Sequence, residues 1–259
     1  MSLARGWAAQ TRVVEALILR ETRTRFGRNY LGYLWGVIEP VLWIMSFWLL
    51  HQMGMRSSRS NLDFVGFIAT GLIPYTMFRS TATRCISAIE GNRGLLFYPQ
   101  IRPLDLVVSR SILEVGTLYV VFAVIVGFNG LATEQFAVDD PLKVIIGMAA
   151  TGLLGATLGL TLCASGAYTK AVERIVSPML RPLFFVSGIF FTANELPSNV
   201  REVLMFNPIL HCVEIVRDGW FPQYTAHHAS PLYPIPWILG LAVVGLAAER
   251  MSRHRVELT

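Results

Sequence analysis

The chain has 259 residues, of which 53% are hydrophobic and only 15% are charged. Soluble domains usually carry about 25% charged residues, so this composition favours a protein of the lipid bilayer. The net charge of +5 does not indicate nucleic-acid binding, because the basic residues are spread through loops of a hydrophobic chain.

The chain opens with a basic cytoplasmic segment, residues 1–30. Within it, residues 10–26 place Val13, Leu17 and Ile18 on one helical face, which predicts an amphipathic helix in the membrane interface. The alternative is an ordinary soluble helix. Six arginines and no apolar signal core precede the first apolar run, so we expect that run to be a retained anchor.

Long apolar stretches predict an all-α polytopic membrane protein, because about 20 apolar residues span a bilayer. We expect six spans in one transmembrane domain, 31–249, followed by a cytoplasmic tail, 250–259. The predicted spans are 31–54, 62–86, 103–129, 142–168, 174–193 and 231–249.

The lysines and arginines gather in alternate connections. They are frequent before the first span, between spans two and three, between spans four and five, and in the tail. By the positive-inside rule both termini are cytoplasmic, and two cytoplasmic termini require an even number of spans.

The fourth predicted span carries Gly152, Gly155 and Gly159, which include a G-x-x-x-G pair. Small residues at this spacing let helices approach closely in lipid. Packing inside the protein is the favoured interpretation, and a dimer seam is the alternative.

The segment 194–222 is too polar for a span but holds short apolar pieces interrupted by prolines. Irregular backbone at membrane depth must be covered by protein or line a wet cavity. We interpret this segment as a re-entrant helical hairpin broken at Asn207-Pro208. An exposed periplasmic loop is the alternative.

Motifs of catalysis and nucleotide binding are missing from the sequence. There is no G-x-x-x-x-G-K-[ST], no H-E-x-x-H and no G-x-S-x-G, and His227-His228 makes only a weak metal pair. We therefore expect no catalytic residue, no metal and no cofactor bound by this chain. A stand-alone lipid-modifying membrane enzyme is the alternative of another class.

Four charged residues fall inside predicted spans: Glu39, Arg79, Arg84 and Arg181. Such residues usually face the protein interior or a watery path. The arginines could bind a phosphate or carboxylate of a passing substrate. Alternatively, Glu39 pairs with an arginine and the others snorkel to the interface.

Aromatic residues cluster near these charges. Tyr30, Trp35 and Trp43 belong to this group around the first span. Aromatic rings form the usual interface belt, and a subset of them could stack on sugars.

Three segments together resemble the permease subunits of ABC-2 type polysaccharide exporters, most closely capsular-polysaccharide permeases of the KpsM and BexB type. The resemblance covers nearly the whole chain. The segments are RETRTRFGRNYLGYLWGVIEP at 20–40, GNRGLLFYPQIRPLDLVVSRSILE at 91–114, and SGIFFTANELPSNVREVLMFNPILHCVEIVRDGWF at 187–221.

The resemblance implies an ATP-driven exporter of lipid-linked capsular polysaccharide in the bacterial inner membrane. It implies a homodimer of this chain with a dimer of cytoplasmic ATPases that bind ATP and Mg, a periplasmic copolymerase and an outer-membrane channel. O-antigen, teichoic acid or another cargo remains an alternative. The residues expected to couple to the ATPase are Glu90, Asn92, Arg93, Tyr98, Arg102, Lys170 and Arg174.

The predicted mechanism has an entrance, a path and an outer gate. The substrate path is assigned to Arg25, Arg28, Tyr30, Trp35, Glu39, Trp43, Arg79, Arg84 and Arg181. The outer gate is assigned to Glu195, Pro208, His211, Glu214 and Arg217.

Overall fold

In the computed structural model, all regular secondary structure of the described residues is helical, which confirms the predicted all-α class for them. The structure describes the backbone of residues 3–26, 30–53, 62–98, 100–133, 138–166, 169 and 171–256. Side chains are described for residues 10–25, 36–53, 62–98, 100–131, 138–166, 169 and 171–251.

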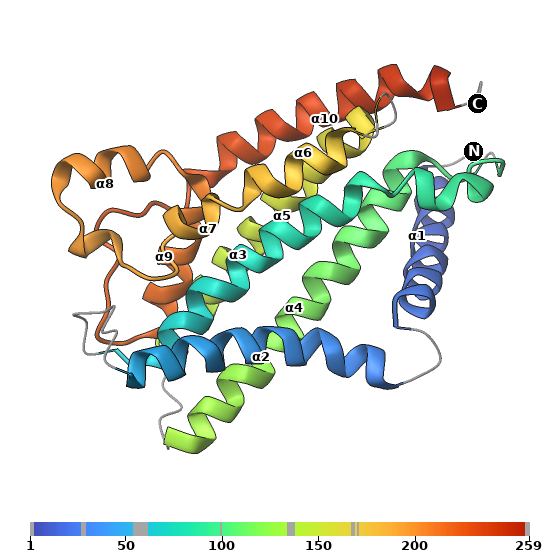
Figure 1. Ribbon diagram of the computed structural model, residues 1–259. Coiled ribbons are helices and arrows are strands. Elements are labelled where there is room, and N and C mark those ends of the chain that lie inside the picture. Colours follow the sequence, from blue (N-terminus) through green and yellow to red (C-terminus); the bar gives the residue numbers. More distant parts are fainter. Residues whose placement is uncertain are drawn as a thin grey trace.

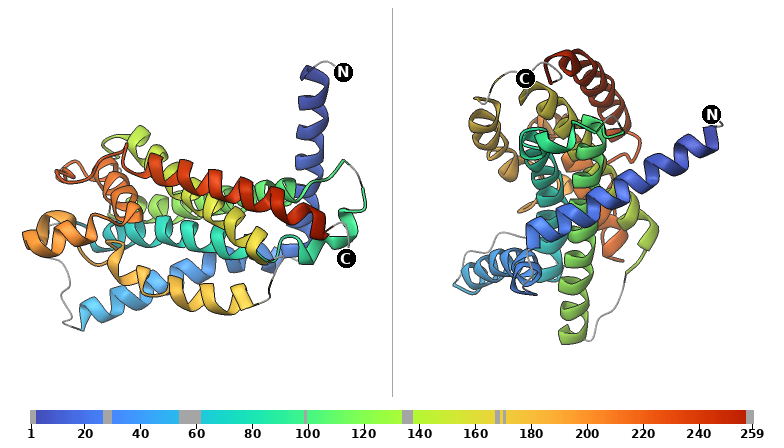
Figure 2. Two further views of the ribbon diagram at one scale, coloured as in Figure 1. Left: turned by 90° about the horizontal axis from the view of Figure 1, so that it is seen from above. Right: turned by 90° about the vertical axis from the view of Figure 1, so that its right-hand side faces the viewer.

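Long helices form the body of the molecule (Figure 1). They are α1 (Leu3–Phe26), α2 (Tyr30–Gln52), α3 (Phe64–Ile86), α4 (Pro103–Thr133), α5 (Pro141–Gly166) and α10 (Pro234–Val256). Helix α5 packs against both α3 and α10, whereas α4 crosses them obliquely. Helix α1 stands across one end, and α10 finishes at that same end (Figure 2).

Short helices complete the chain. They are η1 (Glu90–Leu95), α6 (Ala171–Leu180), α7 (Leu183–Val186), η2 (Ala193–Glu195), α8 (Ser198–Leu204) and α9 (Pro208–Trp220). Helix η1 lies near α1, whereas α7, α8 and α9 lie at the opposite end, on the left of Figure 1. The molecule therefore has an α1 end and an α9 end.

The sequence marks the beginnings of several helices. Helices α4, α5, α9 and α10 each begin with proline, whose missing N–H costs nothing in the first turn. Asp63 caps α3 by accepting a 2.8 Å hydrogen bond from the Gly66 N–H. Asn207 caps α9 in the same way through the Ile209 N–H, at 3.0 Å.

Among the described residues, three helices are long and apolar enough to cross a membrane by length and composition. They cover Pro103–Leu131, Pro141–Gly166 and Pro234–Met251. The predicted fifth span, 174–193, is not one helix: α6 has 10 residues, α7 has 4, and the chain turns between them at Arg181-Pro182. Proline cannot continue a helix without losing a backbone hydrogen bond, which explains the break.

The segment 194–222 forms two short helices, α8 and α9, separated by Met205–Asn207. The chain reaches it through Gly188, whose φ of +79° is a conformation that other residues rarely adopt. A Cβ there would also lie 2.6 Å from the end of the Leu210 side chain, which would have to shift, so the positive φ is the main reason for glycine.

Glycines bring α3 and α5 into close contact. A Cβ on Gly155 would lie 2.7 Å from the Phe78 carbonyl oxygen, and one on Gly159 would lie 2.8 Å from the Cys85 Cβ. Both neighbours belong to the same protomer, which confirms the favoured interpretation of internal packing. The main core fills the space around α3, α4, α5 and α9, and a smaller cluster lies under α1.

Candidate functional site

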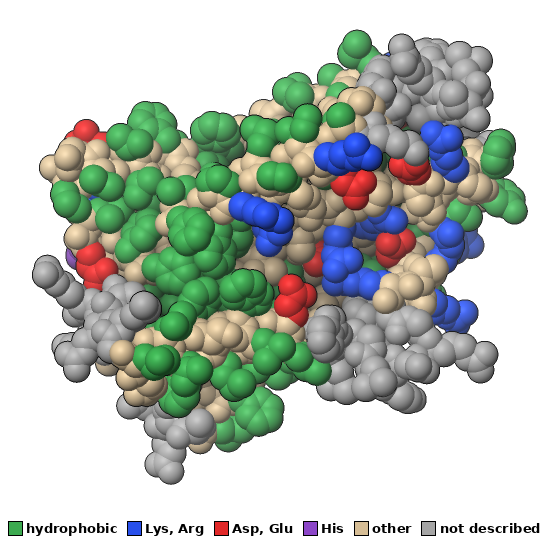
Figure 3. Space-filling view, in the orientation of Figure 1, with side chains coloured by type: hydrophobic (Ala, Val, Ile, Leu, Met, Phe, Trp, Pro, Cys, Tyr) green, Lys and Arg blue, Asp and Glu red, His purple; other side chains and the backbone are tan. Residues whose placement is uncertain are grey.

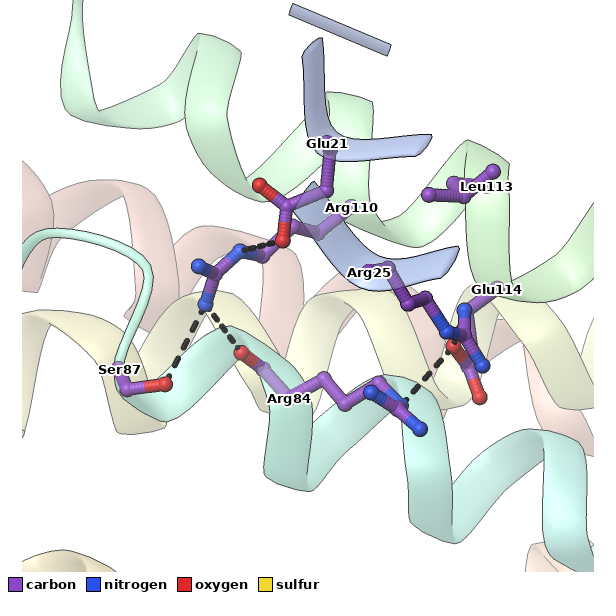
Figure 4. Close-up of a pocket in the computed structure, with 7 residues that line it drawn as sticks. All are labelled: Glu21, Arg25, Arg84, Ser87, Arg110, Leu113 and Glu114. Carbon is purple, nitrogen blue, oxygen red and sulfur yellow. Dashed lines mark hydrogen bonds and ion pairs between the residues drawn. The ribbon is translucent and has the colours of Figure 1, made fainter. Parts of the chain in front are cut away.

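A cluster of charged side chains joins α1, α3 and α4 at the α1 end (Figure 4). At its centre is Glu114 of α4, which is 3% exposed. One of its carboxylate oxygens is 3.0 Å from the Arg84 Nε and also accepts a hydrogen bond from Arg25. One carboxylate therefore holds an arginine from α1 and another from α3.

A second ion pair lies beside the first. Arg110 of α4 places its Nε 2.9 Å from a carboxylate oxygen of Glu21 on α1. Its Nη1 donates to the Arg84 carbonyl at 2.8 Å and to the Ser87 hydroxyl at 3.3 Å. Arg110 thus satisfies a backbone acceptor in the last turn of α3, where carbonyls lack helical partners.

A pocket of about 170 Å³ opens between the two ion pairs. We call its lining the arginine pocket; the lining residues are Glu21, Arg25, Arg84, Ser87, Arg110, Leu113 and Glu114. Three arginines and two glutamates give it a formal charge of +1. Figure 3 shows acidic and basic side chains gathered toward this end of the molecule, whereas apolar side chains cover much of the rest of that face.

Arg25 keeps its charge in this setting. Burial lowers the pKa of its guanidinium, and the nearby Glu114 carboxylate acts in the opposite direction. Because an arginine is not deprotonated in proteins, the pocket presents guanidinium donors that can grip a carboxylate or a phosphate.

Helix α1 is also fastened to the α3–α4 connection. Arg20 donates to the Asn92 side-chain oxygen, and Gln10 donates to the Asp105 carboxylate. Asn92 in turn donates to the Ala88 carbonyl at 2.9 Å. These bonds tie the predicted interfacial helix to the predicted coupling segment and to the first turn of α4.

The predicted ATPase-coupling residues differ in exposure. Glu90, Arg93, Tyr98, Arg102 and Arg174 are exposed, and the neighbouring Phe97 is 88% exposed. Asn92 is only 5% exposed and bonds to α1, so it positions the connection instead of facing outward. Lys170 lies outside the described residues.

The predicted path residues do not form one group. Arg25 and Arg84 meet in the arginine pocket, whereas Glu39, Trp43, Arg79 and Arg181 are exposed at other places. Arg28 and the side chains of Tyr30 and Trp35 lie outside the described residues.

The structural alternatives for the charged residues inside predicted spans were a Glu39–arginine pair and arginines that snorkel to the interface. Among the described residues, Glu39 forms no ion pair, so the alternative of a Glu39–arginine pair is not seen there. Arg84 pairs with Glu114, and its side chain is 51% exposed.

The predicted outer-gate residues on α9 are turned into the protein. Arg217, 0% exposed, donates to the carbonyls of Phe191 at 3.0 Å and Gly188 at 2.7 Å. Its guanidinium also lies 3.2 Å from the Glu214 carboxylate, which accepts a bond from the Tyr224 hydroxyl. This network holds the 187–192 loop against α9.

The remaining gate residues have local roles. His211, 4% exposed, stacks on Tyr233 with ring centroids 4.1 Å apart and bonds to the Met205 carbonyl. Pro208 begins α9, and Glu195 is exposed in a capping box with Thr192. The structure therefore places His211, Glu214 and Arg217 as internal supports of the hairpin.

Sequence reasoning overlooked Glu114, Glu21, Arg110 and Tyr224. Glu114 could have been found, because a carboxylate inside the predicted span 103–129 is the same signal that singled out Glu39. Glu21 and Arg110 lie among many other interface charges and carry no such signal.

Among the described residues, no three His, Cys, Asp or Glu side chains gather as a metal site.

The long apolar helices indicate a helical membrane protein, and the comparison with known families gives its class. A model of the ABC-2 type transporter family matches residues 12–221, so the chain belongs to that family. Among its relatives, the polysialic acid transport protein KpsM of Escherichia coli is 32% identical over 98% of both chains.

Two further relatives extend the comparison. The capsule polysaccharide export inner-membrane protein CtrC of Neisseria meningitidis is 28% identical over 96% of this chain and 94% of its own. The O-antigen export system permease protein RfbA of Klebsiella pneumoniae is 23% identical over 91% and 90%. These relatives are named as transport, export or permease proteins, not as enzymes.

Proposed function

We propose that this chain is the permease subunit of an ATP-driven exporter that moves lipid-linked capsular polysaccharide across the inner membrane. The observation that carries the proposal is similarity over nearly the full chain to relatives named for polysialic acid transport and capsule polysaccharide export. The O-antigen permease is less similar at 23% identity, which favours a capsular cargo over O-antigen.

The arginine pocket supplies an entrance suited to an anionic glycolipid. Arg25 and Arg84 share one carboxylate, and both are positioned at the mouth of the transmembrane helices. A phosphate or carboxylate at the lipid-linked end of the cargo can replace Glu114 as their partner, because guanidinium groups bind both anions in the same fork geometry.

We infer six crossings of the membrane, with both termini in the cytoplasm and the 194–222 hairpin re-entering from the outer face. Helices α2, α3, α4, α5 and α10 supply five crossings, and the broken pair α6–α7 supplies the other. One side of the broken pair packs on the protein: α6 contacts α3 and α5, and Phe184 of α7 lies against Tyr75 of α3. Helix α1 lies in the cytoplasmic interface.

ATP and Mg are bound by a separate ATPase dimer, which pairs with a homodimer of this chain. The exposed residues Arg93, Tyr98, Arg102 and Arg174, together with Glu90 and Lys170, form its docking surface, and Asn92 holds that surface to α1. Closure of the ATPases moves the connection and α1 as one unit. A periplasmic copolymerase and an outer-membrane channel receive the polymer.

The outer gate is built from the α8–α9 hairpin. His211, Glu214 and Arg217 act in it by positioning the loop and the helix, since they are buried away from any passing polymer. Glu195, which is exposed, is the member of the predicted gate that can meet cargo directly.

The proposal is tested in a capsule-forming bacterium from which the capsule permease gene has been deleted. Expression of this chain with a capsule-exporter ATPase should restore surface capsule, and the ATPase should co-purify with the chain from detergent extracts. Restoration of O-antigen display without capsule would support the rival cargo. Failure to bind any ATPase, with lipid-modifying activity in the purified chain, would support the membrane enzyme.

A further inference from the structure

His211 joins three parts of the α9 end. It lies in the first turn of α9 and is 4% exposed. Its Nε2 is 2.9 Å from the Met205 carbonyl oxygen in the turn between α8 and α9, and its Nδ1 is 3.0 Å from the Ser230 backbone nitrogen in the α9–α10 connection. The ring also stacks on Tyr233, which lies just before α10. We call these contacts of His211 with Met205, Ser230 and Tyr233 the His211 clamp.

The two hydrogen bonds determine where the ring carries its proton. A backbone N–H can only donate, so the Nδ1 that faces Ser230 must offer a lone pair. A carbonyl oxygen can only accept, so the Nε2 that faces Met205 must carry the hydrogen. The His211 clamp therefore fits a single form of the side chain, the neutral imidazole with its proton on Nε2.

A second proton on the ring acts unequally on the two bonds. Protonated Nδ1 and the Ser230 N–H would be two donors facing each other, so that bond breaks. Nε2 keeps its hydrogen in the imidazolium, so the bond to the Met205 carbonyl remains. His211 thus stays with the α8–α9 turn in both forms, and the connection to α10 is the part that is released.

The connection depends on this bond more than on any other polar contact near it. Among the described residues, the bond from Ser230 to His211 is the sole hydrogen bond that residues 226–232 make to α8, to α9 or to the loops before them. His227, His228 and Leu232 of the same stretch are exposed. Opening of the connection at Ser230 therefore disturbs little packing.

The surroundings of His211 favour the neutral ring. Burial lowers the pKa of the imidazole and is the largest influence on it, whereas the Met205 carbonyl acts in the opposite direction. Tyr233 faces the ring with ring centroids 4.1 Å apart, and its aromatic face also attracts a cation. These two opposing contacts are weaker than the effect of burial, so the pKa stays below its ordinary value.

The charged groups of the neighbouring elements have other partners or face solvent. Among the described residues, no ion pair includes His211. On α9, Glu214 is bonded to Arg217 and to Tyr224. On α8, Arg201 donates to the Leu196 carbonyl at 3.5 Å, and Glu202 is exposed. Titration of His211 is therefore governed by the His211 clamp itself.

The sign of the pH effect follows from this lowered pKa. A histidine released from the clamp has an ordinary pKa of about 6.5, so the open state binds more protons than the closed state near and below that pH. The stability that the clamp contributes is complete above about pH 6.5 and is lost as the pH falls through the lowered pKa.

We propose that His211 is a proton-operated latch between the α8–α9 turn and the chain that leads into α10. The neutral ring holds Ser230, and the protonated ring releases it while it remains bonded to Met205. Under the proposed topology the latch faces the solution outside the inner membrane, so acid surroundings loosen the outer gate. The link to the gate rests on the proposed function, whereas the latch does not.

Hydrogen exchange on the full chain in detergent tests the latch. The quantity measured is the protection factor of a peptide that contains the Ser230 N–H, compared between about pH 7.5 and about pH 5 and corrected for the intrinsic exchange rate at each pH. It should fall roughly tenfold in the wild type. His211→Gln can donate to Met205 and accept from Ser230 but does not titrate, so its protection factor should not fall.

The matched control is His227→Gln/His228→Gln, which removes two exposed histidines of the same connection. This variant should keep the wild-type fall. A protection factor that stays constant in the wild type, or that falls equally in His211→Gln, would overturn the latch.

A second measurement needs no variant and therefore holds even where His211→Gln does not fold. Exchange of the imidazole Cε1 hydrogen with deuterium in the wild-type chain follows the titration of each histidine separately. The midpoint of His211 should lie below those of His227 and His228. A midpoint equal to or above theirs would show that the clamp does not favour the neutral ring, and the latch would be wrong.

The link to the gate is tested in cells that export surface polymer through this chain. The ratio of polymer displayed at about pH 5.5 to that at about pH 7.5 should be about twofold or more higher for the wild type than for His211→Gln, because a loosened gate opens more easily. Equal ratios, with the exchange results as expected, would remove the link to the gate and leave the latch. Absence of polymer at both pH values in the wild type would count against the proposed function instead.

Discussion

Glu114 is the residue on which the arginine pocket depends. It lies within an apolar helix, is 3% exposed, and holds guanidinium groups from two other helices. A carboxylate in such a place is costly unless it is paired and hydrogen-bonded. Its two arginines remove that cost and at the same time fix α1 to α3 and α4.

We expect Glu114→Gln to destabilise the protein by about 2 kcal/mol, less than for a fully buried pair because the Arg84 side chain is 51% exposed. The thermal unfolding midpoint in detergent should fall by about 4–8 °C. Glu202→Gln, at an exposed position of α8, is the control and should change little. Partial recovery in Arg25→Gln/Glu114→Gln would identify the ion pair as the cause, and an unchanged midpoint in Glu114→Gln would contradict it.

Two tyrosines offer a matched comparison at the α9 end. Tyr224 donates its hydroxyl to the Glu214 carboxylate, which is 0% exposed, whereas Tyr233 makes a 3.3 Å bond to the Phe206 carbonyl at an exposed site. Tyr224→Phe should lower the free energy of unfolding by about 1–3 kcal/mol, because a buried carboxylate loses a donor.

Tyr233→Phe keeps the ring that stacks on His211 and should lie near the wild type in chemical denaturation. Equal effects of the two variants would mean that the Glu214–Arg217–Tyr224 network does not stabilise the hairpin more than a surface contact does. Loss of export in Tyr224→Phe without loss of stability would instead favour a direct gate role.

At the scale of elements, the contact between α3 and α5 depends on glycine. Gly155→Ala places a Cβ 2.7 Å from the Phe78 carbonyl oxygen, so the two helices must separate. We expect a loss of about 1–3 kcal/mol in stability. Gly127→Ala on α4 meets no atom within 4 Å and should be neutral or stabilising, because alanine favours helix more than glycine does. Equal unfolding midpoints for the two variants would contradict close packing.

Most helix positions could be predicted from the sequence because the signals are local. Predicted spans at 103–129 and 142–168 correspond to α4 and α5, whose first residues are Pro103 and Pro141. Apolar length and proline position are properties of neighbouring residues. The predicted fifth span is divided into two helices, because the apolar count does not register the turn at Arg181-Pro182, where Pro182 precedes α7.

The arginine pocket could not be predicted in the same way. Arg25 and Glu114 are 89 residues apart in the chain, and their contact depends on how α1 crosses the end of α4. The sequence indicates that both are charged, but no spacing rule connects residues of different helices. The same holds for Arg217 and the Phe191 carbonyl, since a backbone acceptor has no sequence signature at all.

At the scale of the whole molecule, the two ends differ in chemistry. The α1 end carries the arginine pocket and the exposed α3–α4 connection, whereas the α9 end carries the buried polar supports Glu214 and Arg217. Under the proposed function, the cargo enters at the α1 end and leaves at the α9 end.

This polarity predicts the topology of reporter fusions. A fluorescent protein that folds only in the cytoplasm should be bright when fused after Thr259, and alkaline phosphatase, active only outside, should be active when inserted after His228 in the α9–α10 connection. The reason is that α10 runs from the α9 end to the α1 end as one apolar helix, Pro234–Met251, which separates the two insertion points by a membrane.

Insertion of both reporters after Phe97, in the exposed α3–α4 connection, provides the internal reference and should match Thr259. Phosphatase activity after Thr259, with fluorescence after Phe97, would put these two points on opposite sides and would require an odd number of crossings between them. Fluorescence after His228 would instead remove α10 as a span and, with it, the assignment of the α9 end to the outer face.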